Sequence, residues 1–276
     1  MTKLTIDSIL CNKCGACVEV CPYSILELNE NEETPAINQE RLAYCIHCGH
    51  CEAVCPGGAV QLDYPEAGEV PDIKGNGKLP SPEEMSRQIL MRRSVREYQD
   101  KPVPKGILEE IIKVVHYAPT GVNGQSVHWL GIYEKEKVRD LAKKTIEWMR
   151  FAVKTGMEHP LSFTFPSLVR SWDQGLDPIC RNAPHLMIAY GKKDYPISFV
   201  DSIIALSYFD LLAPSYGIGT CWAGMVQIGL NESPELRESL GLPEGYKAQY
   251  SMLLGYPKYP YQRVPKRNQL VFNWKE

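Results

Sequence analysis

Three features that would define other classes of protein are missing from this sequence of 276 residues. It contains no uninterrupted run of 18 apolar residues, so no transmembrane helix is predicted. It does not begin with a secretory signal peptide, so an oxidising compartment is not expected. It has no concentrated basic stripe, which argues against binding to nucleic acid. We therefore expect a protein of the reducing cytoplasm that binds neither membrane nor nucleic acid.

Net charge is also small, at −3, but it is unevenly distributed. Residues 1–64 contain three basic and nine acidic side chains, whereas the remainder is net +3. An acidic segment of this kind suits electrostatic docking to a basic face. The length predicts about two domains. We expect a first domain at 1–64, a linker rich in glycine and proline at 65–80, and a second domain at 81–276.

Cysteine, by contrast, is abundant, and eight of the ten cysteines lie in two copies of C-x2-C-x2-C-x3-C-P. In this motif three closely spaced thiolates ligate one [4Fe–4S] cluster, and the cysteine before proline ligates the other. Zinc gives no reason for this spacing, and disulfides would need an oxidising compartment. The predicted ligand sets are Cys11, Cys14, Cys17 and Cys55 for one cluster, and Cys45, Cys48, Cys51 and Cys21 for the other.

Over residues 1–64 the chain resembles the bacterial two-cluster ferredoxins, with an internal duplication and a core so thin that the clusters supply much of its folding energy. Cys180 and Cys221 are expected to be buried thiols rather than a disulfide. An acidic turn is predicted at 29–34. Short strands are predicted at 2–9, 24–28, 36–38 and 59–63.

The second domain is predicted to mix helices and strands. Ser81, Pro82 and Glu84 form a capping box that starts a helix ending near Met91. Residues 155–180 are predicted to be irregular and to form a lid or pocket wall. Further helices are expected at 105–117, 136–154, 199–216 and near 231–234, and strands at 127–133, 184–190, 225–228 and 247–255.

Three stretches of this domain are candidates for ligand contact. The arginines of Arg92-Arg93-Ser94-Val95-Arg96 suit a phosphate group, although such a stretch can also be a solvated basic turn. The amides of Asn123 and Gln125 suit an uncharged heterocycle, or simply belong to a loop. The glycines of 217–224 either let the backbone approach a ligand or turn the chain.

Taken in order, these stretches, together with Leu254-Gly255-Tyr256-Pro257 and the basic tail, resemble the nitroreductase family of flavoproteins over about residues 85–276. The resemblance implies an α+β fold with a central, largely antiparallel sheet. It also implies a homodimer with one FMN at each interface. The FMN phosphate and ribityl chain would be held by Arg92, Arg93, Ser94 and Arg96, and by Lys266 and Arg267 of the tail.

The same resemblance implies that a loop, usually from the partner subunit, reaches the flavin through Pro119, Thr120, Asn123 and Gln125. The family usually has Pro-Trp after this glutamine, whereas Ser126 and Val127 follow it here. Backbone groups near Ala223 and Gly224, after Cys221 and Trp222, would approach N5 and O4 of the flavin. No residue is assigned as a general acid, because the flavin carries the chemistry.

We therefore expect an iron–sulfur flavoprotein oxidoreductase that passes electrons through two [4Fe–4S] clusters to FMN. FMN would then reduce a small organic acceptor, such as a nitroaromatic, a quinone or an activated alkene. The donor would be a protein of the ferredoxin or flavodoxin type, or NAD(P)H. Two alternatives stay open. In one, NAD(P)H reduces FMN and the clusters export electrons to a protein; in the other, the chain is a non-catalytic redox relay or sensor.

Overall fold

The computed structural model describes residues 2–28, 34–64, 68, 70 and 79–276. The chain divides into two compact units, one formed by Met1–Asp72 with Thr120–Gln125 and the other by Ile73–Pro119 with Ser126–Glu276. Most of the predicted acidic turn at 29–34 and of the predicted linker at 65–80 lies outside the described residues. The domain boundaries at 64 and 81 stay a prediction. Within the described ranges, none of the helices combines the length and apolarity needed to span a bilayer.

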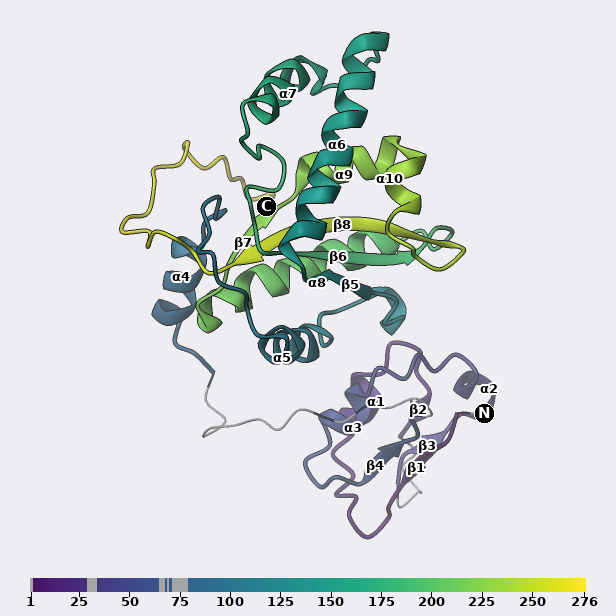
Figure 1. The fold of residues 1–276 in the computed structure, drawn as a ribbon. Helices are drawn as coiled ribbons and strands as arrows, with labels where there is room; N and C mark the ends of the chain where they lie inside the picture. The colour runs from purple at the N-terminus through teal and green to yellow at the C-terminus, as the bar shows by residue number, and fades with distance from the viewer. Residues whose placement is uncertain (1, 29–33, 65–67, 69, 71–78) are drawn as a thin grey trace. The chain divides into compact units, whose positions relative to one another are not determined.

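The first unit contains two small antiparallel sheets (Figure 1). Strand β1 (Leu4–Ile6) pairs with β4 (Val60–Leu62), and β2 (Leu26–Glu27) pairs with β3 (Ala36–Ile37). All four lie where strands were predicted, although each is shorter. The described residues of 1–64 also form three single-turn helices, α1 (Ala16–Glu19), α2 (Gln39–Leu42) and α3 (His50–Ala53). Its buried core is small and consists of Leu4, Cys17, Ile25, Leu26, Val60 and Leu62.

The duplication predicted in this unit extends to the backbone conformation. Residues at equivalent places in the two motifs share the left-handed region, which is sterically costly for residues other than glycine. Gly15 and Gly49 precede α1 and α3 with φ values of 74° and 70°. The other matched positive-φ residues are Lys13 (58°) with His47 (51°), and Ser24 (49°) with Gly58 (63°).

The second unit is built on a four-stranded sheet with the order β5-β6-β8-β7. Its strands are β5 (His128–Ile132), β6 (His185–Lys192), β8 (Tyr246–Gly255) and β7 (Gly219–Trp222), and every neighbouring pair is antiparallel. This sheet confirms the predicted α+β fold with a largely antiparallel centre.

Alternate residues of β6 face two different layers of helices, as the period of a strand requires. Leu186 and Ile188 pack with α6 (Lys135–Thr155), α7 (Phe165–Asp173), α9 (Gly224–Glu232) and α10 (Pro234–Glu238). Met187 and Ala189 pack with α5 (Lys105–Val115) and α8 (Ser198–Leu212). The two helical layers on either side of the sheet are visible in Figure 1.

Helix α4 (Pro82–Met91) begins as predicted. The Ser81 hydroxyl accepts from the Glu84 N–H, and the Glu84 carboxylate accepts from the Ser81 N–H, which completes the capping box. Three 3-10 turns are also present: η1 (Gly121–Asn123), η2 (Ser162–Thr164) and η3 (Ala213–Tyr216).

Two predictions about secondary structure are wrong. Residues 225–228 belong to helix α9 rather than to a strand, because Val226 and Leu230, four residues apart, are buried together on one side of the helix. A short apolar run fits either period, and the strand is instead β7, in the glycine stretch itself. Residues 155–180 are irregular only at 156–161 and 174–180, since η2 and α7 lie between, and Phe165 of α7 is fully buried.

Helix α8, which lies within the helix predicted at 199–216 apart from its first residue, is buried on one side only. Ala205, Leu206 and Phe209 are in the core, whereas Phe199, Val200 and Tyr208 are exposed by 50%, 53% and 46% of their surface. The two charged residues of the helix, Asp201 and Asp210, are both buried. The outer side of α8 is therefore apolar, without charge and uncovered in the single chain.

Candidate functional site

The cysteines of the first unit gather in the two predicted groups. Cys21, Cys45, Cys48 and Cys51, the second predicted ligand set, line one cavity together with Pro22 and Gly49. Cys21 comes from the first motif and the other three come from the second. The last cysteine of the first motif thus lies with the first three cysteines of the second motif. This exchange of one cysteine between motifs is typical of proteins with two clusters.

The electrostatics of the free thiols define the same two groups. Burial raises the pKa of the Cys17 thiol, and the charges of Cys55, Cys11 and Cys14 raise it further. Burial raises the pKa of the Cys51 thiol to about 11, with Cys48, Cys21 and Cys45 acting in the same direction. Four thiolates crowded together repel one another, and the positive charge of bound iron offsets that repulsion as the thiol protons are released. Among the described residues no group of three or more such side chains is arranged to hold a single metal ion. In number and donor type, however, the two quartets fit the four thiolates that each cubane cluster needs.

The sulfur atoms of the two exchanged cysteines accept equivalent hydrogen bonds. The Ile25 N–H donates to Cys21 Sγ at 3.4 Å, and the Ala59 N–H donates to Cys55 Sγ at 3.2 Å. These backbone dipoles favour the thiolate, and they contribute to a lowered pKa at Cys55, where Val60 has the largest effect.

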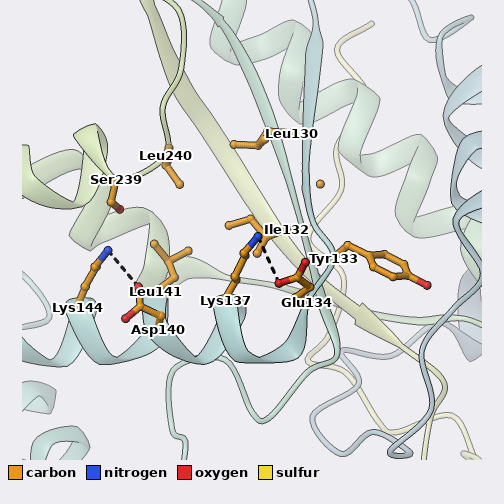
Figure 2. Close-up of a pocket in the computed structure, with 11 residues that line it drawn as sticks. Leu130, Ile132, Tyr133, Glu134, Lys137, Asp140, Leu141, Lys144, Ser239 and Leu240 are labelled. Atoms are coloured by element: carbon orange, nitrogen blue, oxygen red, sulfur yellow. Dashed lines mark ion pairs between the residues drawn. The ribbon is translucent and has the colours of Figure 1, made fainter.

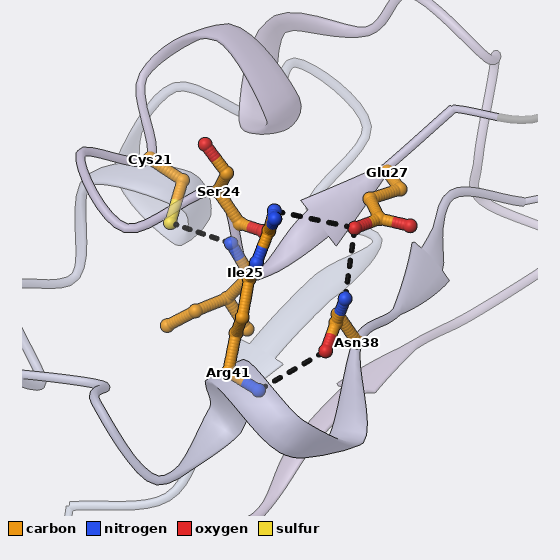
Figure 3. Close-up of polar contacts among 6 residues, drawn as sticks. All are labelled: Cys21, Ser24, Ile25, Glu27, Asn38 and Arg41. Carbon is orange, nitrogen blue, oxygen red and sulfur yellow. Dashed lines mark hydrogen bonds and ion pairs between the residues drawn. The ribbon is translucent and has the colours of Figure 1, made fainter.

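A polar network fixes the chain after Cys21 (Figure 3). Arg41 Nη1 donates to the Ser24 carbonyl at 3.2 Å and lies 3.4 Å from Glu27 Oε1. Asn38 links the two ends of this network, since its Nδ2 donates to Glu27 Oε1 and its Oδ1 accepts from the Arg41 N–H. The left-handed backbone at Ser24 is held in place by these contacts.

The predicted loop residues Thr120, Asn123 and Gln125 belong to the first unit. Asn123 Nδ2 donates to the carbonyl oxygens of Ile46 at 3.0 Å and His47 at 2.9 Å, so both of its N–H bonds are engaged. The Gln125 N–H donates to the Thr120 hydroxyl. Pro119 ends the adjoining segment of the second unit. A contact between this loop and a flavin stays a prediction.

In the second unit the arginine stretch lies directly along β7. Ser94 forms a parallel bridge with Thr220, and the Val95 N–H donates to the Thr220 carbonyl at 2.8 Å. The stretch 254–257 joins the same place, because Tyr98 pairs with Pro257 and the Gln99 N–H donates to the Tyr256 carbonyl. Three of the four stretches singled out from the sequence therefore meet at one edge of the sheet.

Gly219 explains how the arginine stretch comes so close to β7. A Cβ at this position would lie 2.8 Å from Pro257 Cγ and 2.9 Å from Val95 Cβ, and it would overlap Val95 Cγ2. Only glycine leaves room for both neighbours.

The arginine side chains differ in how they are engaged. Arg92 forms an ion pair with Asp210, with Nη1 and Oδ2 3.3 Å apart. Arg93 donates from Nη2 to the Leu90 carbonyl, while its Nε is buried without a hydrogen-bond partner. Arg96 is exposed. An unpaired buried guanidinium N–H beside a second arginine and the Ser94 hydroxyl fits a phosphate group, which would accept the missing bond.

A fourth arginine, which the sequence did not indicate, belongs to the same neighbourhood. Burial raises the pKa of the Cys221 thiol, while the charges of Arg96, Arg181 and Arg92 act in the opposite direction. Arg181 and Asn182 are both left-handed, with φ values of 57° and 51°. Asp177 maintains this turn, because its carboxylate accepts from the N–H groups of Cys180 and Asn182. Backbone strain of this kind is common at ligand sites.

The backbone groups predicted to face the flavin ring are not equivalent. The Ala223 N–H already donates to the Ser251 carbonyl at 2.9 Å. Gly224 is the first residue of α9, where N–H groups have no acceptor within the helix and attract negative charge. Trp222 stands before them, edge-on to Tyr250 with ring centroids 5.2 Å apart. Of these two N–H groups, that of Gly224 is thus the better placed to donate to a ligand, and its contact with a flavin stays a prediction.

The basic tail is extended and exposed at Lys266 and Arg267. It reaches the arginine stretch earlier, at Tyr261, whose hydroxyl donates to the Ser94 carbonyl at 3.3 Å. The predicted contact of the two basic side chains with phosphate stays a prediction. Of the two other cysteines, Cys180 is fully buried as expected and Cys221 is half-buried, and both are free thiols.

A further cavity of the second unit lies away from these residues, between β5, the start of α6 and the chain after α10 (Figure 2). Its charged side chains are paired with one another, Lys137 with Glu134 and Lys144 with Asp140. None of the predicted cofactor-binding residues lines this cavity.

The fold and these sites define an oxidoreductase that combines a unit with iron–sulfur ligands and a unit with a basic ligand site on an antiparallel sheet. The chain belongs to the nitroreductase family, whose sequence model matches residues 89–256. Residues 10–71 match the model of the 4Fe-4S dicluster domain. Both resemblances seen in the sequence are thereby confirmed.

Individual relatives agree with this assignment. The chain is 27% identical over 193 residues to the FMN reductase [NAD(P)H] of Bacillus subtilis, covering 70% of this chain and 74% of the relative. It is 27% identical over 176 residues to a putative NADH dehydrogenase/NAD(P)H nitroreductase of Archaeoglobus fulgidus, covering 64% and 87%. A crystal structure of a Bacteroides fragilis nitroreductase with bound FMN shares the fold, with a TM-score of 0.54, 24% identity, and coverage of 69% of this chain and 99% of that one.

Proposed function

We propose that this chain is an iron–sulfur flavoprotein reductase in which the dicluster domain relays electrons to FMN for the reduction of a small organic acceptor. The single observation that carries the proposal is the presence, in one chain, of two complete cysteine quartets and a nitroreductase domain. When bound, the clusters would supply one-electron transfer and FMN the conversion to two-electron chemistry. The acceptors that we propose for this two-electron reduction are nitroaromatics, quinones and activated alkenes.

The residues of the second unit have separate roles in this proposal. Arg93, with its unpaired Nε, and Arg92 and Ser94 beside it hold the FMN phosphate. Gly224, at the start of α9, donates to the electron-rich edge of the ring, where added negative charge is stabilised by the helix dipole. The protein thus binds and orients the flavin without a protein acid at the reacting atoms.

We also propose that the protein is a homodimer. The outer side of α8 exposes Phe199, Val200 and Tyr208, and the tail exposes Val271 and Trp274 by 86% and 83%. Apolar surface of this extent is costly in water and marks a protein interface. Burying it against a second copy of the chain would also bring a second set of site residues to each flavin.

A second candidate function reverses the direction of the electrons. The names of the Bacillus subtilis and Archaeoglobus fulgidus relatives include NAD(P)H. If NAD(P)H reduces the flavin here too, the clusters would carry electrons out to a protein acceptor with a basic face, which the acidic segment 1–64 suits.

An anaerobic titration separates the two functions. The purified protein is mixed with reduced ferredoxin in one sample and with NADPH or NADH in another, and the loss of flavin absorbance is timed. We expect reduced ferredoxin to bleach the flavin quickly. Fast bleaching by NAD(P)H and slow bleaching by ferredoxin would overturn the proposed direction and support the second candidate.

Substitution of one cluster ligand shows whether electrons reach FMN through the clusters. Cys51→Ala removes one predicted ligand of one cluster, and Cys180→Ala serves as a control because Cys180 is a buried thiol outside both quartets. We expect Cys51→Ala to retain FMN but to lose fast bleaching by ferredoxin, with iron content and EPR reporting the lost cluster. Unchanged bleaching in this variant would contradict the relay.

A further inference from the structure

We propose that Asp210 is a positioning residue of the flavin site, which holds Arg92 and Trp222 in the arrangement that FMN requires. The inference rests on the proposed function, because FMN binding by this chain belongs to that proposal. Asp210 lies on α8, outside every stretch that the sequence pattern singled out.

The Asp210 carboxylate is fully engaged by three donors. Its side chain is only 8% exposed. Oδ1 accepts from the Thr220 hydroxyl. Oδ2 accepts from the Trp222 indole N–H at 3.1 Å and lies 3.3 Å from Nη1 of Arg92. A buried carboxylate with both oxygens engaged is held in one orientation, and it fixes its donors in turn.

These donors come from different places in the fold. Arg92 directly follows α4, while Thr220 and Trp222 lie on β7. Arg92 stands at the predicted phosphate end of the site, and Trp222 precedes the backbone predicted to face the ring. One carboxylate therefore sets the spacing between the two ends of the cofactor site. Without it, a partly buried guanidinium and an indole N–H would lose their acceptor.

Whether removal of Asp210 weakens or tightens FMN binding distinguishes a positioning role from a role of its negative charge alone. Asp210 is an anion close to Arg92, so its charge by itself repels a phosphate. If Asp210 acted only through its charge, removing it would tighten FMN binding. In a folded variant, a loss of affinity therefore means that the fixed geometry of Arg92 and Trp222 outweighs that repulsion.

The test measures FMN affinity of the full-length apo-protein by quenching of flavin fluorescence. We expect Asp210→Ala to weaken binding about 10- to 100-fold, the effect of losing charge-assisted hydrogen bonds. Asp210→Asn keeps the shape and one oxygen acceptor, so its loss should be smaller, and it serves where the alanine variant fails to fold. Because part of the effect acts through Arg92, Asp210→Ala should cost less in an Arg92→Ala background than in the wild type.

Riboflavin, which lacks the phosphate, separates the two ends of the site. With riboflavin the coupling between positions 210 and 92 should disappear, whereas the contribution through Trp222 should remain. Asp201→Asn is the matched control, since Asp201 is also a buried carboxylate of α8 but accepts from the Ser126 hydroxyl rather than from Arg92 or Trp222. Its effect should add to that of Arg92→Ala.

The outcomes distinguish the inference from the function on which it rests. Wild-type protein that binds no FMN overturns both. Wild-type protein that binds FMN, with Asp210 variants of equal or tighter affinity, overturns the positioning role and leaves the proposed function standing. Additive effects of Asp210→Ala and Arg92→Ala overturn the part of the inference that concerns Arg92.

Discussion

The imidazole of His185 stacks on the ring of Tyr133, with centroids 4.4 Å apart and 18° between the ring planes. The same histidine bridges two backbone groups: Nε2 accepts from the Val103 N–H at 2.8 Å, and Nδ1 lies 2.6 Å from the Tyr133 carbonyl. Since Nε2 is an acceptor, Nδ1 carries the proton and donates. His185 is therefore neutral in the folded protein, with one tautomer selected.

This neutral histidine predicts a loss of stability in mild acid. Burial lowers the pKa of His185 below its ordinary value of 6.5. As the pH falls below that value, the unfolded chain binds a proton that the folded chain does not, so stability falls. We expect a decline of at most about 1.4 kcal/mol per pH unit from this group, and none from it above pH 7 or so.

Thermal unfolding measured between about pH 5 and 8 checks this expectation. His185→Gln should be less stable at pH 8 but should show a flatter dependence on pH. His116→Gln, at an exposed histidine, should keep the wild-type slope. An unchanged slope in the His185 variant would show that other groups cause the acid sensitivity.

The internal repeat predicts a stabilising substitution in the first unit. Ser24 has a φ of 49°, and its counterpart Gly58 has a φ of 63°. Ser24→Gly should stabilise the unit by about 1 kcal/mol because it removes a left-handed conformation from a residue with a Cβ. The loss of cluster absorbance in urea reports the change.

Two further variants make the comparison a matched one. Ser24→Ala removes the hydroxyl but keeps the Cβ, so it should bring no gain. Gly58→Ser should destabilise by a similar amount through the backbone alone, because a Cβ at Gly58 meets nothing within 4 Å. If all three variants behave alike, backbone conformation is not the cause.

Gly219 offers a test of the close approach between β7 and the arginine stretch. Gly219→Ala would press a methyl group against Val95 and Pro257, and we expect destabilisation of about 1–3 kcal/mol together with weaker retention of FMN. Gly131→Ala is the control within the same sheet, since its new Cβ would make only an ordinary contact of 3.7 Å with Met187.

A second substitution at Val95 shows whether contact with Val95 causes the stability loss of Gly219→Ala. Val95→Ala in the Gly219→Ala background should restore part of the melting temperature and of the bound FMN, since it removes the clashing methyl groups. A double variant as unstable as Gly219→Ala alone would mean that Pro257, or the backbone itself, resists the change.

The exposed tail predicts a dependence of the dimer on its last residues. Deleting residues 270–276 removes Leu270, Val271, Phe272 and Trp274, each at least 61% exposed in the single chain. We expect this deletion to raise the dissociation constant of the proposed dimer, as measured by sedimentation velocity over a range of concentrations. Deleting only Lys275 and Glu276 should leave the dimer intact. Equal dissociation of both forms would remove the tail from the interface.

The cluster ligands could be predicted from the sequence because their chemistry is local. A cubane needs cysteines at short fixed spacings, and the exchange of Cys21 and Cys55 follows from the repeat. The capping box at Ser81 was equally readable, since its donors and acceptors lie within four residues.

Contacts between residues far apart in the sequence were harder to predict. Met225–Ile228 could be read as strand or helix, and only the packing of Val226 and Leu230 on the sheet decides for the helix. Asp210 is an acidic residue inside an otherwise apolar helix, which was a signal that could have been followed. Its partners Arg92 and Trp222, however, are more than ten residues away in either direction. The position of Arg181 depends on a turn that Asp177 maintains by accepting from backbone N–H groups, and the sequence contains no motif that predicts this turn.

The exchange of one cysteine between the two motifs has a consequence for how the protein is made. Neither motif contains a full set of ligands for one cluster, because Cys21 and Cys55 each serve the other group. A ribosome that has released only the first motif has therefore produced three ligands for a cluster and one for a cluster whose loop does not yet exist. The quartet that contains Cys21 is complete once Cys51 has emerged, and the quartet that contains Cys55 is complete four residues later, so neither cluster can be fully ligated before the second motif is synthesised.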